Sequence, residues 1–141
     1  MPSDLLLKLV NAVHRPVFRI SKGKVAGKGL GMPVLDLTTT GRKSGQKRAT
    51  MLTSPLQRGE EIMLVASRGG DDRNPDWYYN IEADPNVEVQ LGGTTRPMTA
   101  RVADAAERAE LWPLIIEAHD NYAGYQRKTE REIPVVVLSP R

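Results

Sequence analysis

The side chains best suited to chemistry lie in one short basic stretch, residues 38–48. It reads Thr-Thr-Thr-Gly-Arg-Lys-Ser-Gly-Gln-Lys-Arg, and its glycines predict a tight turn between two strands. The turn carries Ser44 and four cations: Arg42, Lys43, Lys47 and Arg48. Glycine lets backbone N–H groups approach a ligand closely, and arginine binds phosphate oxygens through paired hydrogen bonds. The stretch is therefore a candidate anion-binding site, with a solvated basic hairpin tip as the alternative.

Positive charge is concentrated in the first part of the chain. The 141 residues carry a net charge of +3, but residues 1–58 hold eleven Lys or Arg against two Asp or Glu. Such asymmetry favours a polyanionic partner, whether nucleic acid, a phosphorylated ligand or an anionic membrane. Aromatic residues are few and are not interleaved with the cations, which argues against nucleic acid.

Groups that could act as nucleophiles or metal ligands are scarce. There is no cysteine, and His14 and His119 have no metal-ligand spacing, so no metal site is expected. If the chain is an enzyme, a bound cofactor must supply the reactive group. A flat redox cofactor with a phosphate suits the residues available. The turn would bind its phosphate, while the ring or acceptor would meet Ser67, the turn at 68–70, Trp77, Asn80, Tyr122 and Tyr125. Core packing of Trp77 and surface positions for the two tyrosines are the alternatives.

The periodicity of the remaining sequence predicts a mainly β fold of the α+β class. Strands are expected at 34–40, 48–56, 61–67, 87–91, 95–103 and 133–138, the first three as a meander. Helices are expected at 3–20, from an Asn74-Pro75 start to before Pro85, and at 104–119 with an Asp104 cap. This order favours a six-stranded antiparallel barrel with flanking helices over residues 34–141.

Residues 1–33 are expected to precede this barrel as an amphipathic helix and a Gly/Lys-rich linker. The helix at 3–20 carries basic residues opposite its apolar face. Covering one end of the barrel is the favoured interpretation, and contact with a membrane surface is the alternative. Because no apolar run reaches about 20 residues, the expected location is the cytoplasm, with peripheral contact at the inner face of the plasma membrane left open.

Three ordered blocks between residues 34 and 138 resemble one known family. The first is residues 37–48. The second is Val65–Gly70, followed by residues 74–80 and 83–85. The third is Tyr122-x-x-Tyr125-Gln126 leading into residues 131–135. Together they are similar to the deazaflavin-dependent nitroreductase and quinone reductase family of actinobacteria.

This resemblance implies a split β-barrel like that of flavin-binding oxidases, and coenzyme F-420 as the cofactor. F-420 is a deazaflavin with a phosphate, a lactyl group and an oligoglutamate tail, so it is a polyanionic partner. The implied reaction is hydride transfer to a quinone, with nitroaromatic compounds as further acceptors. The implied cofactor-binding residues are Arg42, Lys43, Ser44, Arg48, Ala49, Thr50, Met51, Leu52, Thr53, Val65, Ala66, Ser67, Arg68, Asp76, Trp77, Tyr78, Tyr79 and Asn80. Tyr122 and Tyr125 match tyrosines of the substrate pocket, and Tyr125 lies where the family has its catalytic tyrosine.

The chain departs from the family pattern at several of these positions. Met51 and Thr53 replace a proline and a tyrosine that some members carry, and Arg68 replaces a lysine. Lys128 lies where a third aromatic can line the pocket, so the resemblance specifies the cofactor but not the choice of acceptor. Two other functions stay open: a related barrel that binds FMN, and a non-enzymatic basic module that binds nucleic acid or an anionic membrane. The chain is expected to be a monomer or a homodimer.

Overall fold

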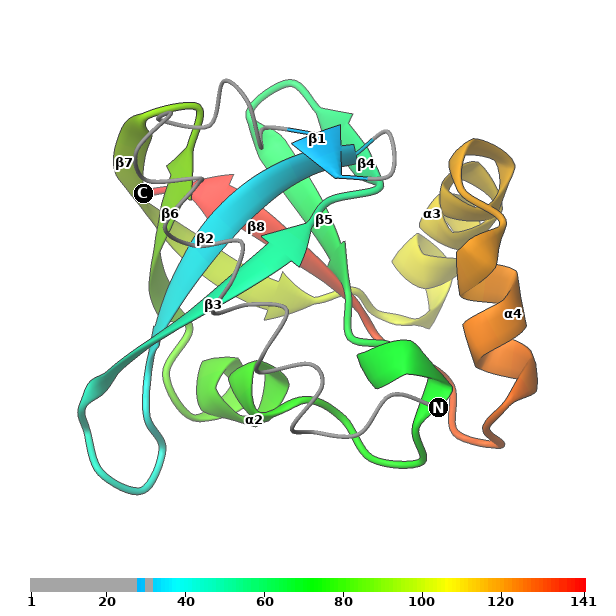
Figure 1. Ribbon diagram of the computed structural model, residues 1–141, viewed down its shortest axis with the longest axis horizontal. Coiled ribbons are helices and arrows are strands. Elements are labelled where there is room, and N and C mark those ends of the chain that lie inside the picture. The colour runs from blue at the N-terminus through cyan, green and yellow to red at the C-terminus, as the bar shows by residue number, and fades with distance from the viewer. Residues whose placement is uncertain (1–27, 30–31) are drawn as a thin grey trace.

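The computed structural model describes residues 28–29 and 32–141 (Figure 1). The helix expected at 3–20 lies outside these residues, as does most of the linker expected at 21–33. The linker prediction is wrong at its end, because Lys28–Gly29 forms strand β1 and strand β2 begins at Met32. The division into an N-terminal segment and a barrel domain stays a prediction.

The described part of the chain contains eight strands, three α-helices and one short 3-10 helix. The strands are β1 Lys28–Gly29, β2 Met32–Thr40, β3 Lys47–Thr53, β4 Leu56–Arg58, β5 Glu61–Val65, β6 Asn86–Leu91, β7 Thr94–Val102 and β8 Val135–Pro140. The helices are η1 Arg68–Gly70, α2 Asp76–Ala83, α3 Ala105–Ala118 and α4 Asn121–Arg127. The mainly β class is confirmed, whereas the count of six strands is wrong because β1 and β4 were not predicted.

The segment expected as one strand, 48–56, is two strands separated at Ser54-Pro55. The Ser54 hydroxyl bonds the carbonyl oxygens of Met63 at 2.6 Å and Leu56 at 3.0 Å, and the Ser54 N–H donates to Pro33 O. The N–H bond still joins Ser54 to β2, the hydroxyl bonds tie it to β4 and β5, and Pro55 has no N–H to continue a strand ladder. The break therefore has a local cause that strand periodicity does not reveal.

All strand pairs are antiparallel, and the sheet order is β1-β2-β6-β7-β8-β5-β4, with β3 on β2. The expected meander is wrong, because β3 pairs with β2 whereas β5 pairs with β4 and β8. Only Ser54-Pro55 separates β3 from β4, although these strands lie toward opposite ends of the sheet order. The sheet therefore curls into a half-barrel that brings its two ends together, as Figure 1 shows.

The core has two main parts, one on each face of the curled sheet, and a small third cluster formed by Val34 and Met51. The larger part packs Leu35, Leu64 and Val136 against Trp77 and Ile81 of α2. The second packs residues of the opposite face of the same sheet against α3 and α4: Met63, Val135, Val137, Leu111, Ile115 and Tyr122. Because β8 is covered on both faces, its sequence is a continuous apolar run rather than an alternating one. No helix of the described residues is long and apolar enough to cross a membrane.

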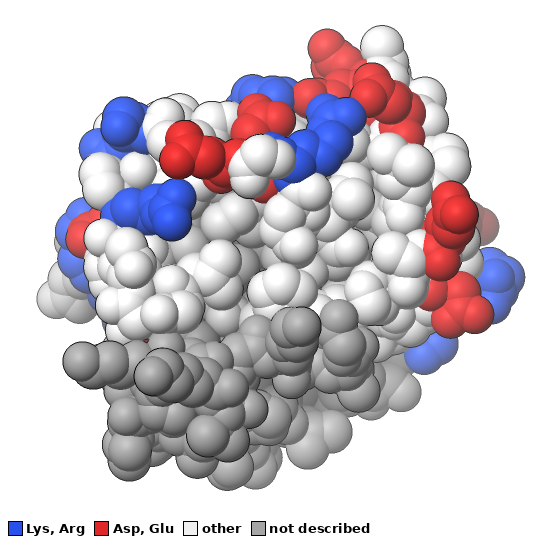
Figure 2. All heavy atoms as spheres, turned by 90° about the horizontal axis from the view of Figure 1, so that it is seen from above, with Lys and Arg blue, Asp and Glu red and all other residues white. Residues whose placement is uncertain are grey.

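The helices and the β2–β3 hairpin have distinct places around the sheet. The Asp104 side chain accepts from the Glu107 N–H at 2.8 Å, which confirms the predicted cap of α3. In Figure 1, α3 and α4 lie together, and the β2–β3 hairpin extends past the sheet on the side where α2 lies. Another face, seen from above in Figure 2, carries cationic and anionic side chains interspersed along its rim.

Candidate functional site

The turn between β2 and β3 has the tight geometry that its glycines predict. The Gly41 N–H donates to Gln46 O at 2.7 Å, and the Gly45 N–H donates to Gly41 O at 2.8 Å. Gly45 has a φ of 71°, which favours glycine, and a Cβ on Gly41 would lie 2.9 Å from Ser44 Oγ. Glycine is therefore favoured at position 45 by its backbone conformation and at position 41 by the close approach of Ser44, and the turn holds residues 42–44 at the hairpin tip.

Arg42 is not a free cation of this turn, because it docks the hairpin onto α2. Its backbone N–H and its Nη1 both donate to Asn80 Oδ1, at 3.1 and 3.0 Å. Its Nη2 lies 3.6 Å from Asp76 Oδ1, and its guanidinium stands 5.2 Å from the ring centroid of Tyr79. Asn80, 5% exposed, also donates to Thr39 Oγ1 at 3.1 Å. The buried Asn80 amide thus joins the turn between β2 and β3 to helix α2.

Three other cations of the hairpin are exposed and available. Lys43, Lys47 and Arg48 have no carboxylate within ion-pair distance among residues 28–29 and 32–141, and Arg48 Nη2 lies 3.5 Å from Ser44 Oγ. Within the same part of the chain, the backbone N–H groups of Lys43 and Ser44 have no acceptor. Unpaired cations beside free N–H donors are the chemistry that binds phosphate and carboxylate oxygens.

Strand β3 leads from these cations to the aromatic residues of α4. It has seven residues, so it spans about 20 Å. Ala49 near its start is exposed, Thr50 and Leu52 are half-buried, and Met51 is buried. The Thr53 side chain at its end lies beside the Tyr122 hydroxyl of α4. An elongated ligand lying along β3 could therefore contact the cationic turn at one end and α4 at the other.

The segment after β5 forms a left-handed turn. Arg68, Gly69 and Gly70 have φ values of 48°, 66° and 87°. Left-handed backbone suits the two glycines but is uncommon for arginine. The Arg68 guanidinium is paired with the Asp71 carboxylate, so this predicted cofactor-binding side chain already has a partner within its own loop. Upstream, Val65 and Ser67 are half-buried and Ala66 is buried.

Arg131 fixes this turn, a role that was not predicted. Its guanidinium donates to Ser67 O and Asp71 O, both at 2.9 Å, and to Asn74 Oδ1 at 2.7 Å. Burial lowers the pKa of Arg131 from its ordinary value. The Asn74-Pro75 start expected for this helix is corrected by one residue: Pro75 holds the cap position of α2, and the Asn74 side chain accepts from Arg131. The one feature of the sequence that could have indicated this role is the position of Arg131 shortly before the last strand.

Helix α4 places its two tyrosines in different environments. Tyr122 is 6% exposed, its hydroxyl donates to Met32 Sδ at 3.5 Å, and its ring meets that of Tyr125 edge-on with centroids 5.8 Å apart. Tyr125 is half-buried. A Cβ on Gly70 would lie 2.8 Å from Tyr125 O, so the left-handed turn packs directly on α4. Tyr122 therefore supports Tyr125, which alone of the pair is open to a ligand.

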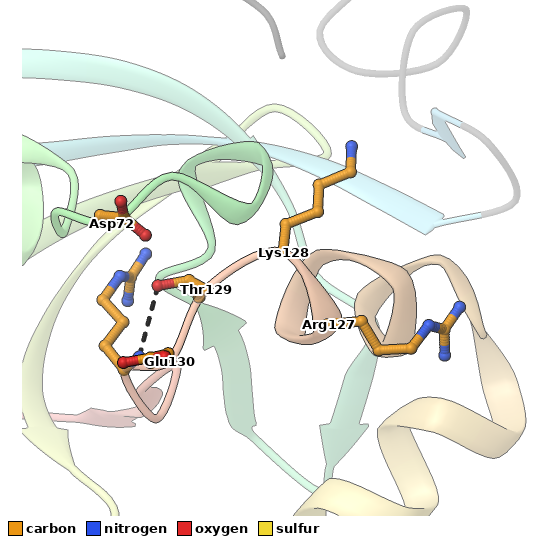
Figure 3. Close-up of a pocket in the computed structure, with 6 residues that line it drawn as sticks. Asp72, Arg127, Lys128, Thr129 and Glu130 are labelled. Carbon is orange, nitrogen blue, oxygen red and sulfur yellow. Dashed lines mark hydrogen bonds between the residues drawn. The ribbon is translucent and has the colours of Figure 1, made fainter.

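An open cavity of about 490 Å³ lies beside this helix. It is lined by Asp72, Arg127, Lys128, Thr129, Glu130 and Arg131 (Figure 3). Its walls come from the end of α4 with the loop that follows, and from the loop after η1. The cavity therefore adjoins the contact between Gly70 and the end of α4. None of its lining residues belongs to the β2–β3 hairpin.

Of the other predicted site residues, those on α2 divide between the core and the surface. Trp77 is 6% exposed within the main core, which is the alternative that its sequence position left open. Asp76 is exposed, and Tyr78 and Tyr79 are half-buried with ring centroids 5.6 Å apart. Burial, and next the Glu82 carboxylate, raise the pKa of Tyr78 above its ordinary value. Whether these side chains contact a cofactor stays a prediction.

A glycine substitution tests the packing of the left-handed turn on α4. Gly70→Ala forces a left-handed alanine and a contact with Tyr125 O, so the free energy of unfolding should fall by about 2–3 kcal/mol. Gly92→Ala is the matched control: its φ of 63° is also left-handed, but an added Cβ meets nothing within 4 Å. Its loss should be only about 1 kcal/mol. Urea unfolding measures both free energies of unfolding. Equal losses for the two variants would contradict the packing of Gly70 on α4.

The pH dependence of stability tests the burial of Tyr122. Burial raises the Tyr122 pKa above its ordinary value of 10.0, and the hydrogen bond with Thr53 offsets part of this. The neutral Tyr122 hydroxyl makes its full contribution to the free energy of unfolding below about pH 10. This contribution is lost as the pH rises through the folded-state pKa of Tyr122. We expect Tyr122→Phe to reduce the fall in Tm between about pH 9 and about pH 11. Parallel curves for the two proteins would contradict this burial effect.

The residues present fit a polyanionic cofactor with a flat ring. The hairpin offers unpaired cations, a hydroxyl and free N–H groups, and β3 leads from the hairpin over about 20 Å to Thr53, which lies beside Tyr122. Coenzyme F-420, implied by the sequence resemblance, has an acidic end and a planar end that match this arrangement. The candidate holding residues are Lys43, Ser44, Lys47, Arg48 and the backbone of the turn.

Comparisons with known proteins identify the family. A family model described as F420H(2)-dependent quinone reductase matches residues 11–140. An F420H(2)-dependent quinone reductase of Mycobacterium tuberculosis is 39% identical over 133 residues, which cover 92% of this chain and 89% of that protein. A solved F420-H2 dependent reductase is 44% identical with a TM-score of 0.68, covering 76% of this chain and 94% of its own.

A second solved structure, described as a domain-swapped dimer, is 40% identical with a TM-score of 0.69 and covers 91% of this chain and 97% of its own. The family match extends over most of the chain, including the hairpin, β3, the left-handed turn and α4. The FMN-binding and non-enzymatic alternatives do not account for this match. The chain belongs to the F420H(2)-dependent quinone reductase family.

Proposed function

We propose that this chain carries out the reaction of its family, the two-electron reduction of a quinone by F420H2, in the site that runs from the hairpin turn along β3 to Tyr125. As a member of the family the chain is an oxidoreductase that uses coenzyme F-420. One observation carries the placement of the site: three unpaired cations lie at one end of β3, and the Tyr122–Tyr125 pair lies at the other.

The hairpin holds the acidic end of the coenzyme. Lys43, Lys47 and Arg48 bind phosphate and carboxylate oxygens, and the free N–H groups of Lys43 and Ser44 add directional donors. Asn80 and Arg42 keep the turn fixed on α2, so the cations are arranged before the ligand arrives. Such preorganisation lowers the entropy lost on binding.

Reduced coenzyme F-420 supplies the hydride when it is bound. The chain's own contribution is to position the reactants and to place charge near them. The turn at Arg68–Gly70 is fixed by Arg131 on one side and by α4 on the other, which makes it a rigid wall. Tyr125 donates a hydrogen bond to a quinone oxygen as negative charge develops there, and the buried Tyr122 ring keeps it oriented.

A single substitution separates this role of Tyr125 from cofactor binding. Tyr125→Phe keeps the edge-on ring contact and removes the donor, so kcat should fall about tenfold while the Kd of F-420 stays within twofold. Stopped-flow reduction of a quinone and a coenzyme titration give the two values. Unchanged kcat, or a loss confined to coenzyme affinity, would remove this role from Tyr125.

The overall function is tested by titrating the protein with F-420 and with FMN and then screening acceptors. We expect binding of F-420 and oxidation of F420H2 by a quinone. Nitroaromatic compounds, which the sequence resemblance also implies, are tested in the same screen. Saturable binding of FMN in place of F-420, or no quinone-dependent oxidation, would contradict the proposal.

We also propose that the curled sheet is the split barrel that the resemblance implies, and that the chain is a homodimer. The short Ser54-Pro55 link between the two ends of the sheet supports the split barrel.

The relative described as a domain-swapped dimer supports the homodimer. Light scattering of the purified protein distinguishes a dimer from a monomer. Contact of residues 3–20 with a membrane stays a prediction.

A further inference from the structure

Lys128 holds a positive charge at the mouth of the proposed acceptor site. It follows α4 by one residue, and its Nζ stands 5.8 Å from the ring centroid of Tyr125. Its aliphatic stem packs on the left-handed turn, because a Cβ on Gly70 would lie 3.0 Å from both Lys128 Cβ and Cδ. The charge is thus held between Tyr125 and the turn of residues 68–70.

This charge has no counter-ion in the part of the chain that the structure describes. Asp72 and Glu130 line the same cavity, but neither carboxylate is within ion-pair distance of Lys128. In Figure 3 the Lys128 side chain extends away from the side chains of Asp72 and Glu130. An exposed, unpaired ammonium with its stem packed in place can attract an anion at low cost in side-chain entropy.

We propose that Lys128 determines acceptor preference: it selects quinones that carry an anionic substituent, a carboxylate or a sulfonate, over neutral quinones of the same ring size. The inference rests on the proposed function, which places the acceptor beside Tyr125. A substituent at the edge of a quinone ring placed beside Tyr125 would lie within reach of the ammonium, because the Lys128 Nζ stands 5.8 Å from the Tyr125 ring centroid. Its attraction is that of an exposed ion pair, so the expected preference is about two- to fivefold.

The chain offers a matched control for the loss of charge. Arg127 is the neighbouring cation, lines the same cavity and is also exposed. Its side chain leads away from that of Lys128 in Figure 3. Lys128→Met and Arg127→Met therefore remove the same charge from adjacent positions at the end of α4, but only the first removes it from beside Tyr125.

The test compares a naphthoquinone with the same ring bearing a sulfonate. For each protein, kcat/KM is measured with both, and fluorescence titration gives the Kd of each oxidised quinone for the protein without coenzyme. Lys128→Met should lower the sulfonate-to-neutral ratio by about two- to fivefold in both measurements, Lys128→Arg should retain it, and Arg127→Met should leave it unchanged. Raising the salt concentration should remove the wild-type preference.

The outcomes separate this inference from the proposed function. If Lys128→Met lowers kcat/KM for both quinones equally, or if Arg127→Met changes the ratio as much, Lys128 does not select anionic acceptors. If the wild-type protein reduces neither quinone, the proposed function is wrong, and the two Kd values still decide whether Lys128 recognises the sulfonate.

Discussion

Replacing Asn80 with leucine should lower the free energy of unfolding by about 3 kcal/mol, a large part of the stability of a small domain. The Asn80 amide makes three hydrogen bonds, to the Arg42 N–H, to Arg42 Nη1 and to Thr39 Oγ1. Thr39 is only 1% exposed, so its hydroxyl loses its best partner in a place that water cannot reach. Leucine has a similar size, which makes lost hydrogen bonding the main change.

Urea unfolding measures this effect, and Asn86→Leu is the control. Asn86 is exposed at the start of β6, where such a change should cost less than about 0.5 kcal/mol. Asn80→Leu should also weaken F-420 binding, because the hairpin loses its attachment to α2. A loss of stability no greater than that of Asn86→Leu would show that the Asn80 amide does not fix the hairpin.

Replacing Lys43, Lys47 and Arg48 together with glutamine should raise the Kd of F-420 about 100-fold at low salt. Each cation is exposed and unpaired in the described structure, and each can form a charge-assisted hydrogen bond to a phosphate or carboxylate oxygen, worth about 1 kcal/mol at an exposed site. Because salt screens exposed charges, the wild-type Kd should rise steeply with ionic strength and that of the variant should not.

A second triple variant, with glutamine at Arg58, Arg96 and Arg127, controls for net charge. These three cations are exposed and lie outside the hairpin. Their replacement should change the Kd by less than about threefold. Arg42 belongs to neither set, because its substitution would act through Asn80 and α2 rather than through direct contact with the ligand. Similar effects of the two triple variants would mean that overall charge, not the hairpin, attracts the coenzyme.

Much of the fold was predictable because its signals are local. Glycines at 41 and 45 mark the hairpin turn, and the apolar run at 135–138 marks a strand covered on both faces. The two missed strands are short: β1 has two residues and β4 has three, too few to show a period. The pairing of β5 with β8 rather than with β3 joins residues 70 to 76 positions apart, and no local pattern encodes it.

The site was predictable in its parts but not in how they connect. The exposed cations and the Tyr122–Tyr125 spacing are visible in the sequence, and the family resemblance assigned both. That Arg42 binds Asn80, 38 residues away, and that Arg131 binds carbonyls of residues 66–71, are products of tertiary structure. Arginine at either position looks like a further ligand-binding cation in the sequence. In the structure each is a positioning residue for the segment that it contacts.

The most direct test is a crystal structure of the protein with coenzyme F-420. We predict that the phosphate and the first glutamates lie within hydrogen-bond distance of Lys43, Lys47 or Arg48, and that the ring lies beside Tyr125 at the far end of β3. A coenzyme whose acidic end makes no contact with the β2–β3 turn, or whose ring lies away from α4, would contradict the account.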